Sequence, residues 1–234
     1  MAILFEPIVL TLLWKGLKMS ITASMVKELR ERTGVGMMEC KSALTETGGD
    51  MEAAVDLLRA KGMAKADKKA GRTAAEGTVA IVLSDDKKRV AIVEANCETD
   101  FVGKGEEFNE FANGVAKAAL DTGATSMEAL MEAKLADGKT VDERRRELIA
   151  KIGENMSIRR FEVIETSGSI GTYRHGDKIG VVVNLEGGDE GLGKDLAMHI
   201  AASRPLAIDA SGVDAETISR EKAIAQTKAD ESGK

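Results

Sequence analysis

The sequence predicts an α+β protein in which a small N-terminal helical bundle precedes two related subdomains, each a β-hairpin followed by a helix. Between residues 19 and 63, apolar residues recur at helical spacing between glycine turns. From residue 75 onward the apolar residues alternate instead, which indicates strands. The hairpin-plus-helix pattern of residues 77–120 then returns at residues 168–203, as in an internal repeat.

The first helix of the bundle is predicted to begin at Thr22, whose side chain suits an N-cap. Its inward face carries Met25, Val26 and Leu29. Gly34 is expected to end the helix, because glycine readily adopts the left-handed conformation that follows a helix C-terminus.

The second and third helices are predicted from the same signals. The second helix starts near Gly36, and one face of it carries Met37, Cys40 and Leu44. Asp50 is expected to cap the third helix, which ends near Gly62. The inward face of the third helix carries Met51, Val55 and Leu58. A bundle of roughly 40 residues is close to the lower size limit for independent folding.

The bundle is followed by a basic segment, residues 64–74, which we interpret as a linker because Lys65 to Arg72 shows no apolar periodicity. The first core subdomain is predicted at residues 75–165. Its hairpin has strands at 78–83 and 89–94 around a polar turn.

Two helices and a third strand complete the first core subdomain. The first helix, from about residue 106 to 120, has one apolar stripe formed by Phe108, Phe111, Val115 and Ala119. Thr140 and Glu143 have the spacing of a capping box and are expected to open a helix that runs to about Ile152. Residues 158–165 then alternate as a strand.

The second core subdomain is predicted at residues 166–234 and is expected to be incomplete. A hairpin at 168–185 precedes a helix at 192–203, in which Leu196 and Ile200 face inward. A charged, weakly amphipathic helix follows from Asp214 to about Ala229. The chain then stops without closing a core, so we expect a truncated end.

Residues 1–18 differ from the rest of the chain. They hold a short apolar run, which is too short to span a bilayer and lacks the basic segment and cleavage site of a signal peptide. We interpret them as a non-native or mis-started leader, with Met19 as an alternative start, in preference to a membrane-associating arm.

Composition narrows the classes of function. The net charge of −6 and the 3% aromatic content argue against a broad nucleic-acid surface, which needs clustered positive charge and stacking rings. Cys40 and Cys97 are expected to be buried thiols in a reducing cytoplasm. His175 and His199 are the chain's two histidines, and no metal-ligand spacing exists. We expect no metal, cofactor, nucleic acid or membrane to be bound.

The most informative motif is the segment from Asn96 to Val102, where an apolar strand runs directly into an Asp100-Phe101 pair. The pattern indicates a strand-to-helix turn. Two interpretations stay open from these residues alone: Phe101 inserts into a partner protein, or Phe101 is a core residue just behind a helix cap.

Several long segments in the right order resemble bacterial elongation factor Ts, the guanine-nucleotide exchange factor of elongation factor Tu. The resemblance covers about residues 21–234 and is carried by these segments: Leu29 to Lys41 (LRERTGVGMMECK), Asn96 to Val102 (NCETDFV), Lys151 to Asn155 (KIGEN) and Ala197 to Ser203 (AMHIAAS).

The resemblance implies a bundle similar to ubiquitin-associated (UBA) domains and a core of two subdomains. It implies that the chain binds elongation factor Tu with GDP or without nucleotide, and promotes release of GDP. Asp100 and Phe101, with Thr99 and Val102 beside them, match the turn that intrudes near the partner's magnesium site. Further contact positions, which we call the anchor residues, are matched by Arg30, Met37, Met38, Ile152, Gly153 and His175. The helical phase of Met37 fits the bundle core, whereas Met38 lies off that stripe.

Three alternatives remain at this point. An inactive fragment of such a factor would share every motif, because the family normally continues beyond this C-terminus. A generic UBA-like protein-binding module would explain the bundle but not the repeated hairpin-plus-helix units. An enzyme would need a nucleophile and a base, for which Cys97 with His175 or His199 is the conceivable pairing.

Overall fold

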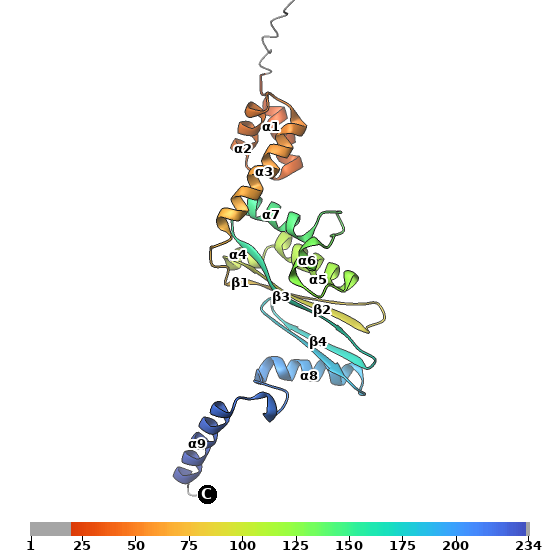
Figure 1. The fold of residues 1–234 in the computed structure, drawn as a ribbon, viewed down its shortest axis with the longest axis vertical. Coiled ribbons are helices and arrows are strands. Elements are labelled where there is room, and N and C mark those ends of the chain that lie inside the picture. The colour runs from red at the N-terminus through yellow and green to blue at the C-terminus, as the bar shows by residue number, and fades with distance from the viewer. Residues whose placement is uncertain (1–19, 233–234) are drawn as a thin grey trace, which may run out of the picture. The chain divides into compact units, whose positions relative to one another are not determined.

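The computed structural model describes residues 20–232, so the predicted leader at 1–18 lies outside the described residues. The described chain divides into two compact units. Up to Ala70 the chain belongs to the first unit, which also takes in residues 146–153, and the remainder forms the second unit. Figure 1 gives the order of the helices and strands. Among residues 20–232, no helix is long and apolar enough to cross a membrane.

Three helices form the bundle of the first unit: α1 (Ala23–Thr33), α2 (Met37–Glu46) and α3 (Met51–Lys69). The predicted caps are confirmed. Thr22 Oγ1 accepts a hydrogen bond from the Met25 amide at 3.2 Å, and Gly34 ends α1 with a positive φ of 68°. The fully or nearly buried core residues are Val26, Leu29, Cys40, Ala43, Leu44, Ala54 and Leu58.

The prediction that α3 ends near Gly62 is wrong. The predicted linker at residues 64–74 is also wrong in its first part, because residues 64–69 belong to α3. The helix continues to Lys69 through residues of good helix propensity. Gly62 is buried inside it, and a Cβ at this position would lie only 3.0 Å from the Ala150 side chain. Gly62 therefore permits close packing and does not stop the helix.

The second unit begins with a three-stranded antiparallel sheet in the order β1-β2-β3. Its strands are β1 (Glu76–Leu83), β2 (Arg89–Cys97) and β3 (Met156–Glu165). Glu76 pairs with Cys97 at one end of the first ladder, and Cys97 pairs with Met156 in the second. The predicted hairpin and third strand are thus confirmed.

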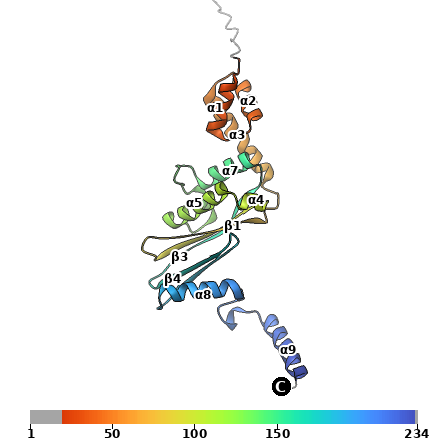
Figure 2. The same ribbon diagram turned by 180° about the vertical axis from the view of Figure 1, so that it is seen from behind.

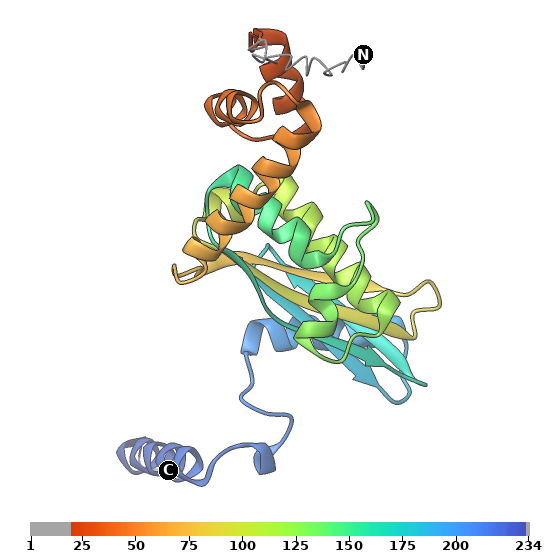
Figure 3. The ribbon, with the colours of Figure 1, turned by 45° about the horizontal axis from the view of Figure 1, so that its top comes forward.

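Helices on one side of this sheet complete the first core subdomain (Figure 3). They are α4 (Asp100–Gly103), α5 (Glu106–Thr122) and α6 (Met127–Glu132). A further helix, α7 (Val141–Ile152), begins in the second unit, and its residues from 146 onward belong to the first unit. The predicted apolar stripe of α5 is buried along its length. The capping box of α7 forms as predicted: Glu143 accepts from the Thr140 amide at 2.9 Å, and Thr140 accepts from the Glu143 amide at 3.1 Å.

The second hairpin consists of β4 (Ser169–His175) and β5 (Ile179–Leu185), and α8 (Glu190–Ser203) packs against both strands. The hairpin lies on the face of the β1-β2-β3 sheet opposite α5, with α8 beyond it (Figure 2). Gly171 and Gly193 allow α8 to approach β4 closely, because a Cβ on Gly171 would lie 2.2 Å from the Gly193 carbonyl oxygen. Leu196 and Ile200 are half-buried, and the fully covered face of α8 is formed by Gly193, Ala197 and Ala201.

The predicted repeat of a hairpin followed by a helix is therefore confirmed, and with it the α+β class. Within the described residues the first sheet has three strands and the second has two. A short 3-10 helix, η1 (Ala210–Gly212), and a final helix, α9 (Ala215–Ser232), follow α8, and α9 has no buried residue.

Candidate functional site

The turn between β2 and α5 presents Phe101 to solvent. We call residues Thr99–Val102 the Phe101 turn. Thr99 is the N-cap of the four-residue helix α4, and its hydroxyl accepts from the Val102 amide at 3.5 Å. Phe101 is 85% exposed, the largest exposed fraction of any described Phe. The predicted strand-to-helix turn is confirmed, whereas the interpretation of Phe101 as a core residue is wrong.

One carboxylate, that of Glu154, holds the N-terminal side of this turn. It accepts hydrogen bonds from the Glu98 amide at 3.2 Å, the Thr99 amide at 3.0 Å and the Thr99 hydroxyl at 2.6 Å. In return, the Glu98 carboxylate accepts from the Asn155 amide at 2.6 Å and pairs with Arg72 at 2.6 Å. Charge-assisted hydrogen bonds of this kind are about twice as strong as neutral ones. The end of β2 is thereby fastened to the segment that leads into β3.

The C-terminal side of the turn is held by Asn109, which lies on α5. Its amide nitrogen donates to the carbonyl oxygens of Gly103 at 2.9 Å and Gly105 at 3.0 Å. Its amide oxygen accepts from the Thr78 hydroxyl at 3.1 Å. The bond to Gly103 satisfies a carbonyl group that the C-terminal end of α4 leaves unpaired, and the bond to Gly105 reaches the N-cap of α5. The short helix is therefore fixed at both ends while Phe101 remains free.

Asp100 is ionised beside the exposed ring. Its carboxylate accepts a hydrogen bond from the Lys104 ammonium at 2.8 Å. That hydrogen bond and the charge of Lys104 lower the pKa of Asp100, and Lys178 contributes in the same direction. The turn thus displays one apolar ring together with one ion pair.

Cys97, which ends β2, is buried behind the same turn and donates to the Thr99 carbonyl oxygen at 3.1 Å. Burial raises the pKa of the Cys97 thiol to about 11, and the negative charges of Glu154 and Glu76 act in the same direction. The thiol is neutral at pH 7, whereas a nucleophilic cysteine needs a lowered pKa. The part of the chain from 20 to 232 contains no cluster of His, Cys, Asp and Glu side chains that could hold a metal ion.

His175 lies at the end of β4, where residues 175–178 form what we call the His175 turn. The imidazole is exposed and shares a 3.0 Å hydrogen bond with the Tyr173 hydroxyl. The turn is attached to the first sheet, because the Val79 amide of β1 donates to the Asp177 carbonyl oxygen at 2.7 Å. The structure therefore places His175 in the same unit as Phe101.

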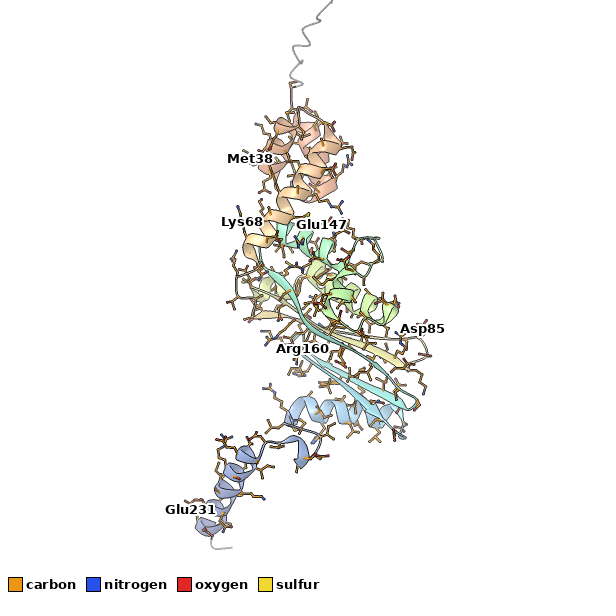
Figure 4. All side chains as sticks on the ribbon, viewed as in Figure 1. Met38, Lys68, Asp85, Glu147, Arg160 and Glu231 are labelled. Carbon is orange, nitrogen blue, oxygen red and sulfur yellow. The ribbon has the colours of Figure 1, made fainter. Side chains whose placement is uncertain are left out.

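Two exposed methionines begin α2 in the first unit. Met38 is 76% exposed and projects from the bundle surface (Figure 4), and Met37 is 54% exposed. The prediction that Met37 faces the core is wrong. Met37 shares a helical stripe with Cys40 and Leu44 but lies in the first turn. Side chains of a helix lean toward its N-terminus, so a first-turn side chain extends past the core.

The remaining anchor residues also belong to the first unit. Arg30 is exposed in the last turn of α1. Ile152 is half-buried at the end of α7, and Gly153 follows it with a positive φ of 93°. The Gly153 carbonyl oxygen accepts a hydrogen bond from Lys69 of α3. The predicted contact residues are therefore divided: the Phe101 turn and His175 in the second unit, and the others in the first.

The residues that support the Phe101 turn were missed by sequence reasoning. Glu154 lies 55 residues from Thr99 in the chain, and no local pattern pairs them. One signal was present: Glu154 falls in the segment Lys151 to Asn155. For Asn109 the signal was weaker: it is a polar residue between Phe108 and Phe111, on a helix whose apolar stripe they help to form.

Comparison with known proteins agrees with the resemblance in the sequence. The family model described as Elongation factor TS matches residues 98–234. Elongation factor Ts of Hydrogenovibrio crunogenus is 59% identical over 216 residues, which cover 92% of this chain and 74% of that protein. The protein of the same name from Methylococcus capsulatus is 61% identical over 217 residues, covering 92% and 74%. That from Arthrospira platensis is 52% identical over 215 residues, covering 92% and 87%. The chain therefore belongs to the elongation factor Ts family of translation elongation factors.

Proposed function

We propose that the chain is a guanine-nucleotide exchange factor that binds elongation factor Tu and promotes the release of GDP. The observation that carries the proposal is Phe101, an aromatic ring that is 85% exposed on a helix fixed at both ends. Burying such a ring stabilises a complex by roughly 1.5–3 kcal/mol. A rigid support lets the complex receive this energy without the cost of ordering the turn.

Exchange follows from differential binding to two states of the partner. GDP and magnesium hold each other in a nucleotide site, because the metal bridges phosphate oxygens to the protein. A factor that binds the empty site more tightly than the occupied one must weaken GDP by the same factor, by linkage. We infer that Phe101 enters a pocket that opens when elements around the magnesium site shift, and that Asp100 perturbs groups near the metal.

The anchor residues have a different role in this proposal. Arg30, Met37 and Met38 on the bundle, with Ile152, Gly153 and His175, would hold the partner equally well before and after GDP leaves. Contacts of equal strength in both states tighten binding without changing the maximal rate. The bundle then acts as the UBA-like grip that the family resemblance implies.

The proposal assigns the chain no covalent chemistry and no cofactor of its own. Support comes from Cys97, whose neutral and buried thiol is unsuited to nucleophilic attack. Binding to elongation factor Tu also requires neither nucleic acid nor membrane. As a translation factor, the chain would act in the cytoplasm.

The test is the release of fluorescent GDP from elongation factor Tu with substoichiometric chain. We expect many release events per chain molecule. The Phe101→Ala variant should be slow, while Leu206→Ala, which removes a side chain of similar exposure (79%) outside the site, should match the unaltered chain. Binding without acceleration by the unaltered chain would contradict the proposal and favour a binding module or an inactive fragment.

A further inference from the structure

Three side chains connect the Phe101 turn to the His175 turn across the first sheet. We call Asn109, Thr78 and Arg174 the relay. Asn109 holds the Gly103 carbonyl oxygen at 2.9 Å and accepts from the Thr78 hydroxyl at 3.1 Å. The same hydroxyl accepts from the Arg174 guanidinium at 2.8 Å. Arg174 directly precedes His175. Gly103, which directly follows the Phe101 turn, and Arg174, which directly precedes the His175 turn, are thus joined by hydrogen bonds through one hydroxyl group.

The hydroxyl of Thr78 is the central atom of the relay because it donates on one side and accepts on the other. Thr78 is 3% exposed, so water has little access to replace either bond. Losing a partner costs most for a buried polar group, and hydrogen bonds in a chain polarise one another. The side chain therefore has one favoured arrangement, which depends on Asn109 and Arg174 together.

The His175 turn has further attachments to β1, which keep it at a fixed distance. Lys178 of the turn pairs with Glu76 of β1 at 2.5 Å, while a 3.0 Å hydrogen bond from Arg174 to the Asp177 carboxylate closes the turn itself. Close packing accompanies these polar contacts. A Cβ on Gly180 would lie 2.5 Å from Val79 Cγ1. The hairpin therefore packs against β1 with no room for a side chain at position 180.

We propose that Thr78 and Arg174 are positioning residues that couple the Phe101 turn to the His175 turn, so that elongation factor Tu meets them as one preorganised surface. The identity of the partner rests on the proposed function, whereas the coupling itself concerns this chain alone. A claim of coupling needs a demonstrated effect of one site on the other. Two experiments supply it, one without the partner and one with it.

The first experiment measures amide hydrogen exchange in Thr78→Val, which keeps the shape of the side chain and removes the hydroxyl. The reporters are the amides of Gly103, the last residue of α4, of Lys104, its C-cap, and of Val79, which bonds to the His175 turn. We expect all three to exchange about fivefold faster, the effect of losing about 1 kcal/mol of local stability. Thr78→Ser should restore slow exchange. Thr172→Val, at a β4 threonine with no side-chain hydrogen bond among the described residues, is the matched control.

Unchanged exchange at Gly103 and Lys104 in Thr78→Val would overturn the coupling. Arg174→Gln provides a second route, because Arg174 is at the surface and its replacement leaves the buried hydroxyl in place. It should also speed exchange at Gly103, although the altered residue lies on the other hairpin. Arg159→Gln, at an exposed arginine of β3, is its control.

The second experiment is a double-mutant cycle between Phe101→Ala and His175→Ala, read as kcat/KM for GDP release. In the unaltered background, the fold loss of kcat/KM in the double variant should differ from the product of the two single-variant losses by at least about threefold, as for coupled residues. In the Thr78→Val background, the loss in the double variant should equal the product of the two single-variant losses, which means no coupling. Coupling that persists in Thr78→Val would overturn the relay. A chain that never accelerates GDP release would instead contradict the proposed function, and the hydrogen-exchange result would still decide the coupling.

Discussion

Phe101 in the second unit and Met38 in the first are both large apolar side chains displayed on short helical segments, but their supports differ. Phe101 is 85% exposed, and Met38 is 76% exposed. The helix under Phe101 is held by Glu154 on one side and Asn109 on the other. The first turn under Met38 begins at Gly36, which provides no side-chain cap. One ring is presented rigidly, and the other side chain is itself flexible.

The difference indicates two kinds of recognition in one protein. A ring on a fixed turn can fill a pocket only if that pocket has the right shape, so it can favour one state of a partner. A methionine has three rotatable bonds and adapts to many surfaces. It therefore adds affinity without selecting a state. The following predictions test this contrast, from the largest expected effect to the smallest.

Phe101→Ala should have the largest effect on exchange. Losing roughly 1.5–3 kcal/mol of burial lowers kcat/KM by about ten- to a hundredfold. The melting temperature should stay the same, because the ring makes little contact within the free chain. Fluorescent-GDP release and thermal unfolding measure the two quantities. A loss of folding stability as large as the loss in exchange would show that Phe101 acts through folding.

Glu154→Gln should loosen the Phe101 turn and so make its support more like that of Met38. The amide that replaces a carboxylate oxygen cannot accept from Thr99, so a charged acceptor of three hydrogen bonds is impaired. We expect kcat/KM to fall about tenfold and stability to fall by about 1–3 kcal/mol. Urea unfolding gives the stability, and exchange is measured under conditions where the variant is folded. Glu186→Gln, at an exposed glutamate, should change neither quantity.

Met38→Ala should raise KM about three- to tenfold and leave the maximal rate unchanged, because it removes apolar area that contributes equally in both states. Met38→Leu keeps most of that area and should restore KM. Met63→Ala, at a methionine of α3 that is 46% exposed, is the control. A fall in the maximal rate for Met38→Ala would remove the distinction between the two sites.

Cys97→Ala should have the smallest effect on exchange, below about twofold at pH 7, since a neutral buried thiol has no role in binding. The thiol's pKa of about 11 in the folded chain exceeds the value of about 8.5 for an unfolded one. Its contribution to stability is thus fully present below pH 8.5 or so and is lost as the pH rises toward 11. Unfolding in urea at several pH values should show this decline in the unaltered chain and less of it in Cys97→Ala.

Features set by neighbours in the chain were predictable from sequence. The capping box of Thr140 and Glu143 formed as expected, because both partners lie within one helical turn. The Phe101 turn was found for a similar reason, since a buried strand leads straight into Thr99. Its exposure was left open, because a Phe after a helix cap can point either way.

Features set by residues far apart were not predictable. Glu154 bonds to Thr99, which lies 55 residues away in the chain. Gly62 lies inside α3, where it packs closely against Ala150. Both depend on the tertiary structure, which overrides local preference. The error at Met37 is of a different kind. Helical phase gave the correct face, but the position in the first turn placed the side chain beyond the core.

The maximal rate of GDP release from elongation factor Tu, measured at saturating chain for Phe101→Ala and Met38→Ala side by side, tests the central claim most directly. The contrast between a rigid ring and an adaptable anchor predicts that Phe101→Ala lowers the maximal rate while Met38→Ala reaches that of the unaltered chain at higher concentration. Equal maximal rates for both variants and the unaltered chain would contradict it.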